Sequence, residues 1–162
     1  MRLTLHTDYA LRVLIYAGLS DGRLVTISEI AEFHGISKNH LTKVVHQLGK
    51  AGFLETVRGK YGGLRLMRAP KDISLGAFVR ATEDDFAVAR CMRVGGARAG
   101  DDGEVETCRL DATCLARHAF TEGIAAFFGA LDRYTLADIL AGQRLGVGAL
   151  PSRRPGLAAS SG

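Results

Sequence analysis

The sequence predicts a mainly α-helical fold with one small β-hairpin. Two short amphipathic segments, about residues 28–33 and 38–50, are separated by a few residues that include a glycine, as in two helices joined by a tight turn. Two runs with alternating apolar residues, 52–58 and 64–67, flank a glycine-rich tip and predict the hairpin. Residues 114–134 then carry apolar and aromatic side chains at helical spacing. Together these features predict a winged helix-turn-helix followed by a long dimerisation helix.

An earlier helix is expected over residues 8–20, where apolar residues recur at helical spacing. Thr7 is its predicted N-cap, and Asp8 falls in the first turn, where the helix dipole favours a carboxylate. A signal peptide would keep its apolar core free of charge, whereas Asp8 and Arg12 interrupt this one. No run approaches the ~18 apolar residues of a membrane span. We therefore expect a buried helix in a cytoplasmic protein.

The two helices of the helix-turn-helix have recognisable start signals. Thr26 and Glu29 fit a capping box, in which each side chain bonds to the backbone N–H of the other residue. Ser37 can cap the second helix, whose buried face is expected to hold Leu41, Val44, Val45 and Leu48. Its opposite face presents Lys38, Asn39, His40, Lys43 and Gln47. This polar face predicts a recognition helix.

The second half of the chain divides into a loop, a helical region and a tail. A short helix is expected over 74–81, followed by a solvated loop over 92–107 that is rich in glycine and acidic residues. The 114–134 helix has an apolar stripe too wide for a monomer of this size to cover, so we expect a homodimer. One or two further turns are expected over 135–140. The predicted units are a winged helix-turn-helix domain at 1–82, a cysteine-bearing loop at 83–113, a dimerisation helix at 114–141 and a disordered tail at 142–162.

The charge distribution favours DNA as a partner of the first half. Residues 1–80 hold 12 lysines and arginines against 6 acidic residues, whereas residues 81–162 hold 9 against 11. A basic module of this kind suits contact with a polyanion, and recognition helices enter the major groove by their N-terminal end. The alternative is that these basic residues form only a solvated face. The candidate DNA-binding residues are Ser37, Lys38, Asn39, His40 and Lys43 on the helix and Arg58, Gly59, Lys60, Gly62 and Gly63 in the wing.

The only three cysteines of the chain, Cys91, Cys108 and Cys114, cluster in one segment. An odd number argues against a disulfide framework, and thiolates favour iron–sulfur clusters, zinc or copper(I). Sixteen residues separate the first two and five the last two, which is wide for zinc but tolerable for an iron–sulfur cluster. Such a cluster normally takes four ligands. The candidates for the fourth are Asp8, Asp111, His118 and the acidic residues of the loop.

Five segments resemble those of a known family. They are residues 3–12 (LTLHTDYALR), 27–31 (ISEIA), 37–41 (SKNHL), 58–66 (RGKYGGLRL) and 131–138 (LDRYTLAD). Together they resemble the Rrf-two family of winged-helix iron–sulfur regulators, and within it most closely the repressors that sense nitric oxide. The resemblance covers about residues 1–141. It implies a homodimer with crossed long helices that binds operator DNA and releases it when nitric oxide reaches the cluster.

The resemblance also implies a ligand set. Three cysteines hold each cluster and match Cys91, Cys108 and Cys114, and an aspartate from the partner subunit matches Asp8. A [4Fe-4S] cluster is favoured over [2Fe-2S]. A sibling branch uses a histidine three residues after the last cysteine, where this chain has Arg117, with His118 one position later. The long insertion at 92–107 departs from the family. Each doubling in the length of a flexible loop raises the free-energy cost of closing it by only roughly 0.6 kcal/mol, so the insertion need not abolish the site.

Other functions remain open at this point. A regulator of the same fold could respond to iron or peroxide, and a cluster-free thiol switch or zinc-stabilised DNA-binding module would use the same cysteines. An enzyme is not expected, because the sequence has no P-loop, metal-hydrolase motif or nucleophile–base pair.

Overall fold

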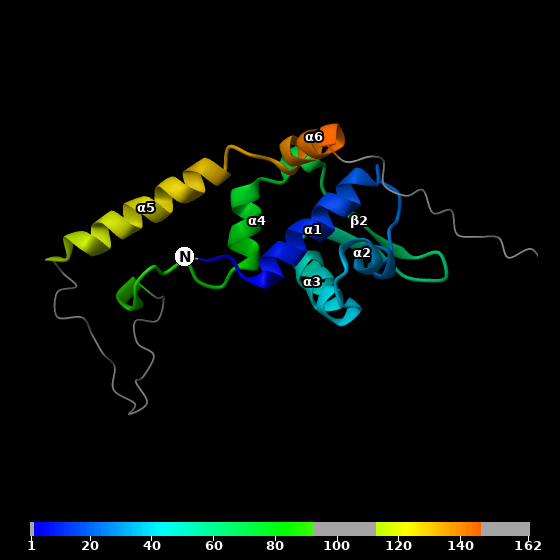
Figure 1. Cartoon of the computed structure of the whole chain (residues 1–162), viewed down its shortest axis with the longest axis horizontal. Helices are drawn as coiled ribbons and strands as arrows, with labels where there is room; N and C mark the ends of the chain where they lie inside the picture. Colours follow the sequence, from blue (N-terminus) through cyan, green and yellow to red (C-terminus); the bar gives the residue numbers. More distant parts are fainter. Residues whose placement is uncertain (1, 93–112, 147–162) are drawn as a thin grey trace, which may run out of the picture.

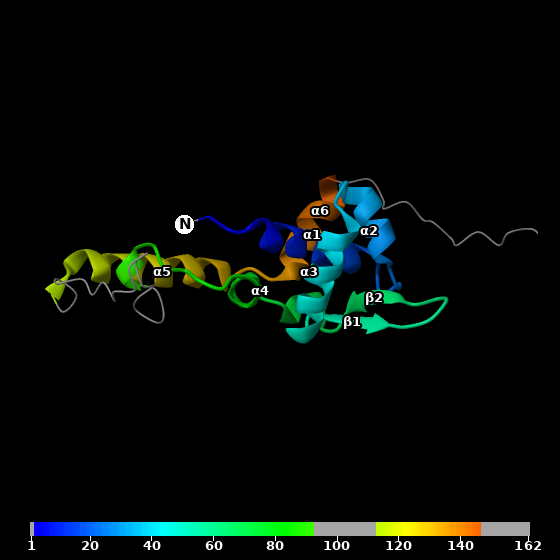
Figure 2. The ribbon, with the colours of Figure 1, turned by 90° about the horizontal axis from the view of Figure 1, so that it is seen from below.

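The computed structural model describes residues 2–92 and 113–146 of the 162-residue chain. The expected loop at 92–107 and the expected tail therefore fall almost wholly outside the described residues. A compact winged domain occupies one end of the molecule, and a long helix, α5, extends away from it (Figures 1 and 2). The elements are α1 (Leu5–Leu19), α2 (Ile27–His34), α3 (Lys38–Lys50), β1 (Leu54–Val57), β2 (Gly63–Leu66), η1 (Pro70–Asp72), α4 (Leu75–Thr82), η2 (Arg90–Met92), α5 (Leu115–Leu131) and α6 (Leu136–Gly146).

Helix α1 is the centre of the winged domain. It contacts α2, α3, α4, α6 and β2. Ala10, Val13 and Leu14 are fully buried on it, which accounts for the apolar spacing of the sequence. The other large core side chains come from every neighbouring element and include Ile30, Leu41, Leu48, Leu64, Ile73 and Phe78. One continuous core therefore joins the helices and the wing.

The predicted start of the first helix was wrong. Helix α1 begins at Leu5, and Thr4 caps it by accepting a bond from the Thr7 backbone N–H at 3.3 Å. Thr7 is instead a buried helix residue whose hydroxyl donates to the Thr82 side-chain oxygen at 3.0 Å. The sequence pattern could not reveal this bond, because its partner lies at the end of α4. Asp8 remains in the first turn, as expected.

The predicted capping box of α2 is confirmed. The Glu29 backbone N–H donates to the Thr26 hydroxyl at 3.2 Å, and the Thr26 backbone N–H donates to the Glu29 carboxylate at 2.7 Å. Arg23 adds an ion pair to Glu29 at 2.9 Å. Burial raises the pKa of Glu29, but the bonds from Thr26 and Arg23 outweigh it and leave that pKa below its ordinary value.

Thr26→Ala is expected to lower the free energy of unfolding by about 1 kcal/mol, because it removes the hydroxyl that accepts from the Glu29 backbone N–H at the start of α2. Urea denaturation followed by circular dichroism measures this. Thr42→Ala is the matched control, since that exposed hydroxyl bonds only to the Lys38 carbonyl of its own helix. Equal losses in both variants would contradict a specific role for the capping box.

Helix α3 has the predicted bounds, and the predicted buried face is confirmed. Ser37 occupies the N-cap position, but its side chain makes no capping bond, so this part of the prediction was wrong. Gln47 was placed on the polar face, yet it is half-buried and its amide donates to the Ala81 carbonyl at 3.4 Å. The remaining polar residues of α3 are exposed.

The wing is an antiparallel hairpin, as predicted, with Leu54 opposite Leu66 and Val57 opposite Gly63. Val25 extends this small sheet by exchanging two backbone bonds with Leu64, at 3.0 and 2.8 Å. A Cβ atom at Gly63 would lie 2.7 Å from the Val25 carbonyl oxygen. Glycine at this position therefore lets the wing pack against the helical domain.

The predicted long helix at 114–134 is shorter, because α5 ends at Leu131. The chain then turns, and α6 folds back on α1, where Leu140 packs against Gly18. Thr135 and Asp138 begin α6 with a mutual cap, the carboxylate accepting from the Thr135 N–H at 2.8 Å. Helix α6 also runs to Gly146, further than the expected turn or two. The segment 114–141 thus contains two helices with different surroundings.

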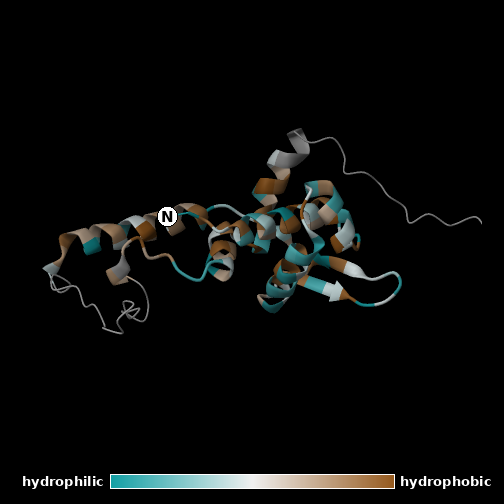
Figure 3. Ribbon diagram, turned by 60° about the horizontal axis from the view of Figure 1, so that its bottom comes forward, coloured by the Kyte–Doolittle hydropathy of each residue, from teal (hydrophilic) through white to brown (hydrophobic). Residues whose placement is uncertain are grey.

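Helix α5 has little cover in a single chain. Phe128 is its one buried residue, and Leu115 is 78% exposed. Figure 3 shows hydrophobic residues along this extended helix. Within the described residues, no helix is long and apolar enough to cross a membrane.

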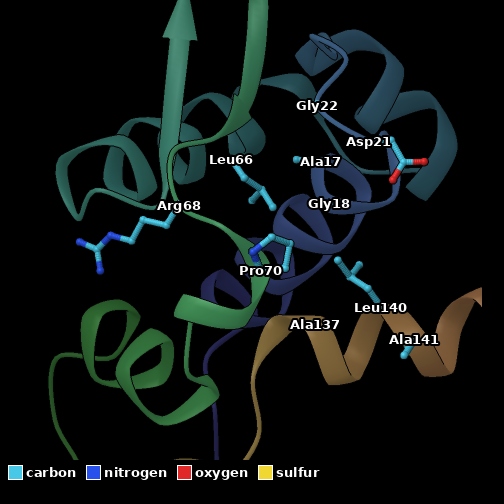
Figure 4. Close-up of a pocket in the computed structure, with 10 residues that line it drawn as sticks. All are labelled: Ala17, Gly18, Asp21, Gly22, Leu66, Arg68, Pro70, Ala137, Leu140 and Ala141. Carbon is cyan, nitrogen blue, oxygen red and sulfur yellow. The ribbon is translucent and has the colours of Figure 1, made fainter.

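A hollow of about 550 Å³ lies between the C-terminal end of α1, the chain around β2 and η1, and α6 (Figure 4). Small residues such as Ala17, Gly18 and Ala137 leave the space. Leu66 points toward it, whereas the Arg68 side chain points away. The hollow belongs to the α1–α6 packing, and neither the polar face of α3 nor the two described cysteines line it.

Candidate DNA interface and metal centre

The N-terminal half of α3 presents the polar face that the sequence predicted. Ser37, Lys38, Asn39, His40 and Lys43 are all exposed. Within the described residues, neither lysine forms an ion pair, so both charges are available to a polyanion. Thr42 is also exposed, lies three and four residues after Asn39 and Lys38, and was missed, although this spacing was visible in the sequence.

The wing tip joins β1 to β2 and is strongly exposed. Arg58 and Lys60 form no ion pair with any described residue. Tyr61 is 79% exposed, and the Lys60 ammonium lies 5.7 Å from its ring centroid. Tyr61 was not among the predicted contacts, although an aromatic residue in a basic glycine-rich tip was a usable signal.

Two wing glycines have structural reasons for being there. Gly59 has φ of +118°, a conformation that side chains rarely adopt. A Cβ atom at Gly62 would collide with the Val57 carbonyl oxygen and lie 2.9 Å from that of Gly59. The shape of the wing therefore requires these glycines, whether or not they also let DNA approach closely.

The recognition helix contacts the start of α1. The ring of His40 stacks on that of Tyr9, with centroids 6.3 Å apart. Tyr9 follows Asp8, the candidate fourth ligand, and Asp8 pairs with Arg12 at 3.0 Å. Asp8 is therefore adjacent in sequence to Tyr9, whose ring contacts His40 of α3.

The two described cysteines lie toward the end of the molecule that is remote from the wing. Cys91 is in η2, and Cys114 is the N-cap residue of α5 (Figures 1 and 2). Both are half-buried free thiols, so both can act as thiolate ligands. Cys108 lies outside the described residues. Within those residues no three potential metal-ligating side chains gather.

The candidates for a fourth ligand occupy different places. Asp8 is half-exposed at the start of α1. His118 is exposed on α5 one turn after Cys114, and its backbone N–H donates to the Cys114 carbonyl at 3.3 Å. Residues four apart share a helix face, so His118 lies near Cys114, a candidate ligand in the same chain. Asp111 lies outside the described residues.

The segment that leads to Cys91 is anchored at two points. The Thr4 backbone N–H donates to the Glu83 carboxylate at 2.6 Å. Phe86 packs edge-on against Phe128 of α5, with centroids 4.7 Å apart. The chain that carries Cys91 is therefore tied to α1 and to α5.

Sequence comparisons identify relatives that cover most of the chain. The chain is 44% identical over 144 residues to the HTH-type transcriptional regulator NsrR of Bacillus licheniformis, covering 88% of this chain and 94% of that protein. It is 43% identical over 141 residues to NsrR of Bacillus subtilis, covering 86% and 90%. Relatives with this name agree with the resemblance found in the sequence.

Two solved structures share the fold. T. potens IscR matches with a TM-score of 0.68 and 21% identity, over 91% of this chain and 93% of that one. The oxidized form of Staphylococcus aureus CymR matches with a TM-score of 0.64 and 22% identity, over 86% and 96%. These likenesses confirm the predicted mainly helical fold with a hairpin wing.

The family model described as Rrf2, an iron-dependent transcriptional regulator, matches residues 3–142. That match and the NsrR relatives confirm the expectation of a DNA-binding regulator rather than an enzyme. The chain belongs to the Rrf2 family of transcriptional regulators.

Proposed function

We propose that this protein is a cytoplasmic, nitric-oxide-responsive transcriptional repressor. It acts as a homodimer that carries an iron–sulfur cluster, binds operator DNA and releases it when the cluster is nitrosylated. The observation that carries the proposal is that one chain has both an exposed basic face on the recognition helix α3 and free thiols at Cys91 and Cys114. The resemblance of the sequence to nitric-oxide-sensing repressors supports the choice of nitric oxide as the signal, and the chain is 44% and 43% identical to two regulators named NsrR.

The DNA-binding role follows from the exposed polar groups. Lys38, Asn39, His40 and Lys43 enter the major groove, where lysine can bond to guanine and asparagine to adenine. Ser37 and the free N–H groups at the start of α3 suit a phosphate. In the wing, Arg58, Gly59, Lys60, Gly62 and Gly63 follow the backbone, and Arg58 reaches a minor groove.

The exposed apolar residues of α5 support the proposed dimer. Its apolar residues, including Leu115 and Phe120, are exposed in the single chain. Burying an apolar side chain contributes roughly 1.5–3 kcal/mol, so a second α5 crossing the first gives these residues the cover they lack. The partner subunit then brings its own α1 toward the cysteines of the first.

The cysteine thiolates and one further ligand hold the cluster. Cys91, Cys108 and Cys114 supply soft sulfur ligands, and Asp8 of the partner subunit supplies an oxygen. The bound cluster, [4Fe-4S] in preference to [2Fe-2S], supplies irons that react with nitric oxide. Asp8 and Tyr9 link the state of the cluster to DNA binding, because Tyr9 contacts His40 of the recognition helix.

Spectroscopy of anaerobically purified protein tests the proposal. We expect a brown chromophore with stoichiometric iron and sulfide, and loss of both colour and operator binding on nitric oxide titration. Loss of binding with peroxide or iron chelation, but not with nitric oxide, would assign another signal. Colourless protein after anaerobic reconstitution with iron and sulfide would exclude the cluster.

Asp8→Ala is expected to change the visible circular dichroism of the cluster, whereas His118→Ala leaves it unchanged. The reason is that the aspartate is a ligand and the histidine only a neighbour of Cys114. Both variants remove an exposed or half-exposed polar side chain from a helix, and only Asp8→Ala also removes an ion pair, that with Arg12, so circular dichroism in the far ultraviolet checks that both retain their helix content. The reverse result would make His118 the fourth ligand.

A cluster-free thiol switch is the second candidate. It is favoured by the free, half-buried state of Cys91 and Cys114 and by the likeness to a regulator solved in an oxidized form. Elemental analysis distinguishes it, because a thiol switch contains neither iron nor sulfide. A zinc-stabilised module would instead contain zinc alone.

A further inference from the structure

An exposed ion pair joins α4 to the end of α5. Arg80 donates two bonds to Asp132, at 2.8 and 2.7 Å, so the planar guanidinium is paired with the carboxylate edge to edge. The guanidinium carbon also lies 4.2 Å from the ring centroid of Phe128. Ser74, the N-cap residue of α4, donates a further long bond to Asp132 at 3.5 Å. These residues, Arg80, Asp132, Phe128 and Ser74, are here called the α4–α5 latch.

Backbone contacts hold the same joint. The Leu75 N–H donates to the Tyr134 carbonyl and the Leu136 N–H to that of Ile73, both at 2.8 Å. Gly76 lies directly beneath the Asp132 carboxylate, where any Cβ atom would collide with it. The absence of a side chain at Gly76 therefore provides the space on α4 that the Asp132 carboxylate occupies.

The Arg80–Asp132 ion pair is expected to contribute little to the free energy of folding. The Arg80 and Asp132 side chains are 44% and 42% exposed, and ion pairs with that much solvent contribute little to folding. A paired guanidinium instead restricts geometry, because both of its bonds must keep their directions. The latch thus constrains the angle at which α5 leaves the winged domain.

We propose that the α4–α5 latch sets the distance between the two DNA half-sites that the dimer recognises. The inference rests on the proposed role of α5 as the dimer interface. Phe128 is the one buried residue of α5, so the angle of that helix depends on the joint where the latch lies. The recognition helix moves with the winged domain, on the other side of this joint.

A small rotation at the latch has a large effect on the DNA-binding surface. Helix α5 has 17 residues, which corresponds to roughly 25 Å of length. A rotation of about 10° at the latch displaces the far end of α5 by roughly 4 Å relative to the winged domain that carries α3, which exceeds the ~3.4 Å rise of one base pair. Helix-turn-helix dimers require their half-sites at a defined separation, so such a rotation changes the preferred spacing.

A panel of duplexes with altered half-site spacing tests the inference. Wild-type holo protein selects its half-site from a random-sequence duplex library, and the spacer between two such half-sites is then lengthened or shortened by single base pairs. Arg80→Met keeps an apolar stem over Phe128 and removes both bonds, and Asp132→Asn keeps the shape and removes the charge. Arg133→Met is the matched control, since Arg133 follows the end of α5 and its side chain donates to the Gly129 carbonyl of that helix rather than to α4.

We expect the wild type and Arg133→Met to prefer one spacer by on the order of tenfold or more. Arg80→Met and Asp132→Asn lose that preference or move it, while their affinity for a duplex with a single half-site is unchanged. Circular dichroism and light scattering check that both variants fold and dimerise, and one folded, dimeric variant is sufficient. An unchanged spacer profile in a folded, dimeric latch variant would overturn the inference, as would a wild-type dimer indifferent to spacing. A monomeric wild type would instead refute the proposed dimer.

Discussion

Cys114→Ser is expected to abolish cluster binding and to reduce operator affinity to the non-specific level, a loss of ~10³-fold or more. The thiolate is a soft ligand, and the serine hydroxyl that replaces it is a poor ligand for the iron of a cluster. The exchange is almost isosteric. Cys114 also occupies the N-cap position of α5 without a capping bond, and serine is a preferred N-cap residue. Iron and sulfide content, with operator affinity from fluorescence anisotropy, measure the effect.

The position of Cys114 separates ligand loss from misfolding. Because serine suits the start of α5, the variant is expected to keep the helix content and the urea midpoint of the cluster-free wild type. Thr113→Ala changes the exposed neighbour and is expected to retain cluster and affinity. A Cys114→Ser protein that still carries iron and binds the operator would remove this cysteine from the proposed ligand set.

Phe78→Ala is expected to lower the free energy of unfolding by about 3–5 kcal/mol. Phe78 is 1% exposed and meets Phe53 edge-on, with ring centroids 6.1 Å apart. Truncation removes the buried ring and leaves a cavity between α4 and the base of the wing. Domains are commonly stable by only about 5–15 kcal/mol, so this variant is expected to lie near the limit of folding. Urea denaturation of the cluster-free protein measures the loss.

Tyr61→Ala is the aromatic control for the core prediction. Tyr61 is exposed at the wing tip, so its removal is expected to change stability by no more than about 0.5 kcal/mol. A loss similar to that of Phe78→Ala would show that the wing tip is part of the cooperative core. A small loss for both would show that the core repacks around the missing ring.

Local sequence signals predicted the helix-turn-helix and the wing well. The capping box of Thr26 and Glu29 spans four residues, and the apolar spacing of α3 is complete within the helix itself. Signals of this kind depend on residues within one or a few helical turns, so they can be recognised in the sequence without knowledge of the tertiary structure. The hairpin is equally local, because its strands lie on either side of one short tip.

Contacts between distant segments could not be predicted in this way. Thr7 resembled an N-cap because threonine favours that position, but its partner Thr82 is 75 residues away. The end of α5 was also missed, since the Leu75–Tyr134 bond that accompanies the turn depends on α4. The pairing of Arg80 with Asp132 has the same origin, because neither residue belongs to a local motif.

The candidate site was predicted in residue type more than in arrangement. Exposure of Lys38, Asn39 and Lys43 followed from helical periodicity. The glycines of the wing, read as allowing close approach to DNA, also have steric reasons within the protein. The cysteine pattern indicated a soft metal, but a ligand supplied by another chain has no local sequence signal.

The stacking of Tyr9 on His40 has a thermodynamic consequence. Binding equilibria at two sites that share a structural element are reciprocal. If ligation at Asp8 favours the position of α3 that fits the operator, then operator DNA must favour ligation at Asp8 by the same free energy. The DNA-bound protein would therefore hold its cluster more tightly than the free protein, and the operator itself would be an effector of the metal site.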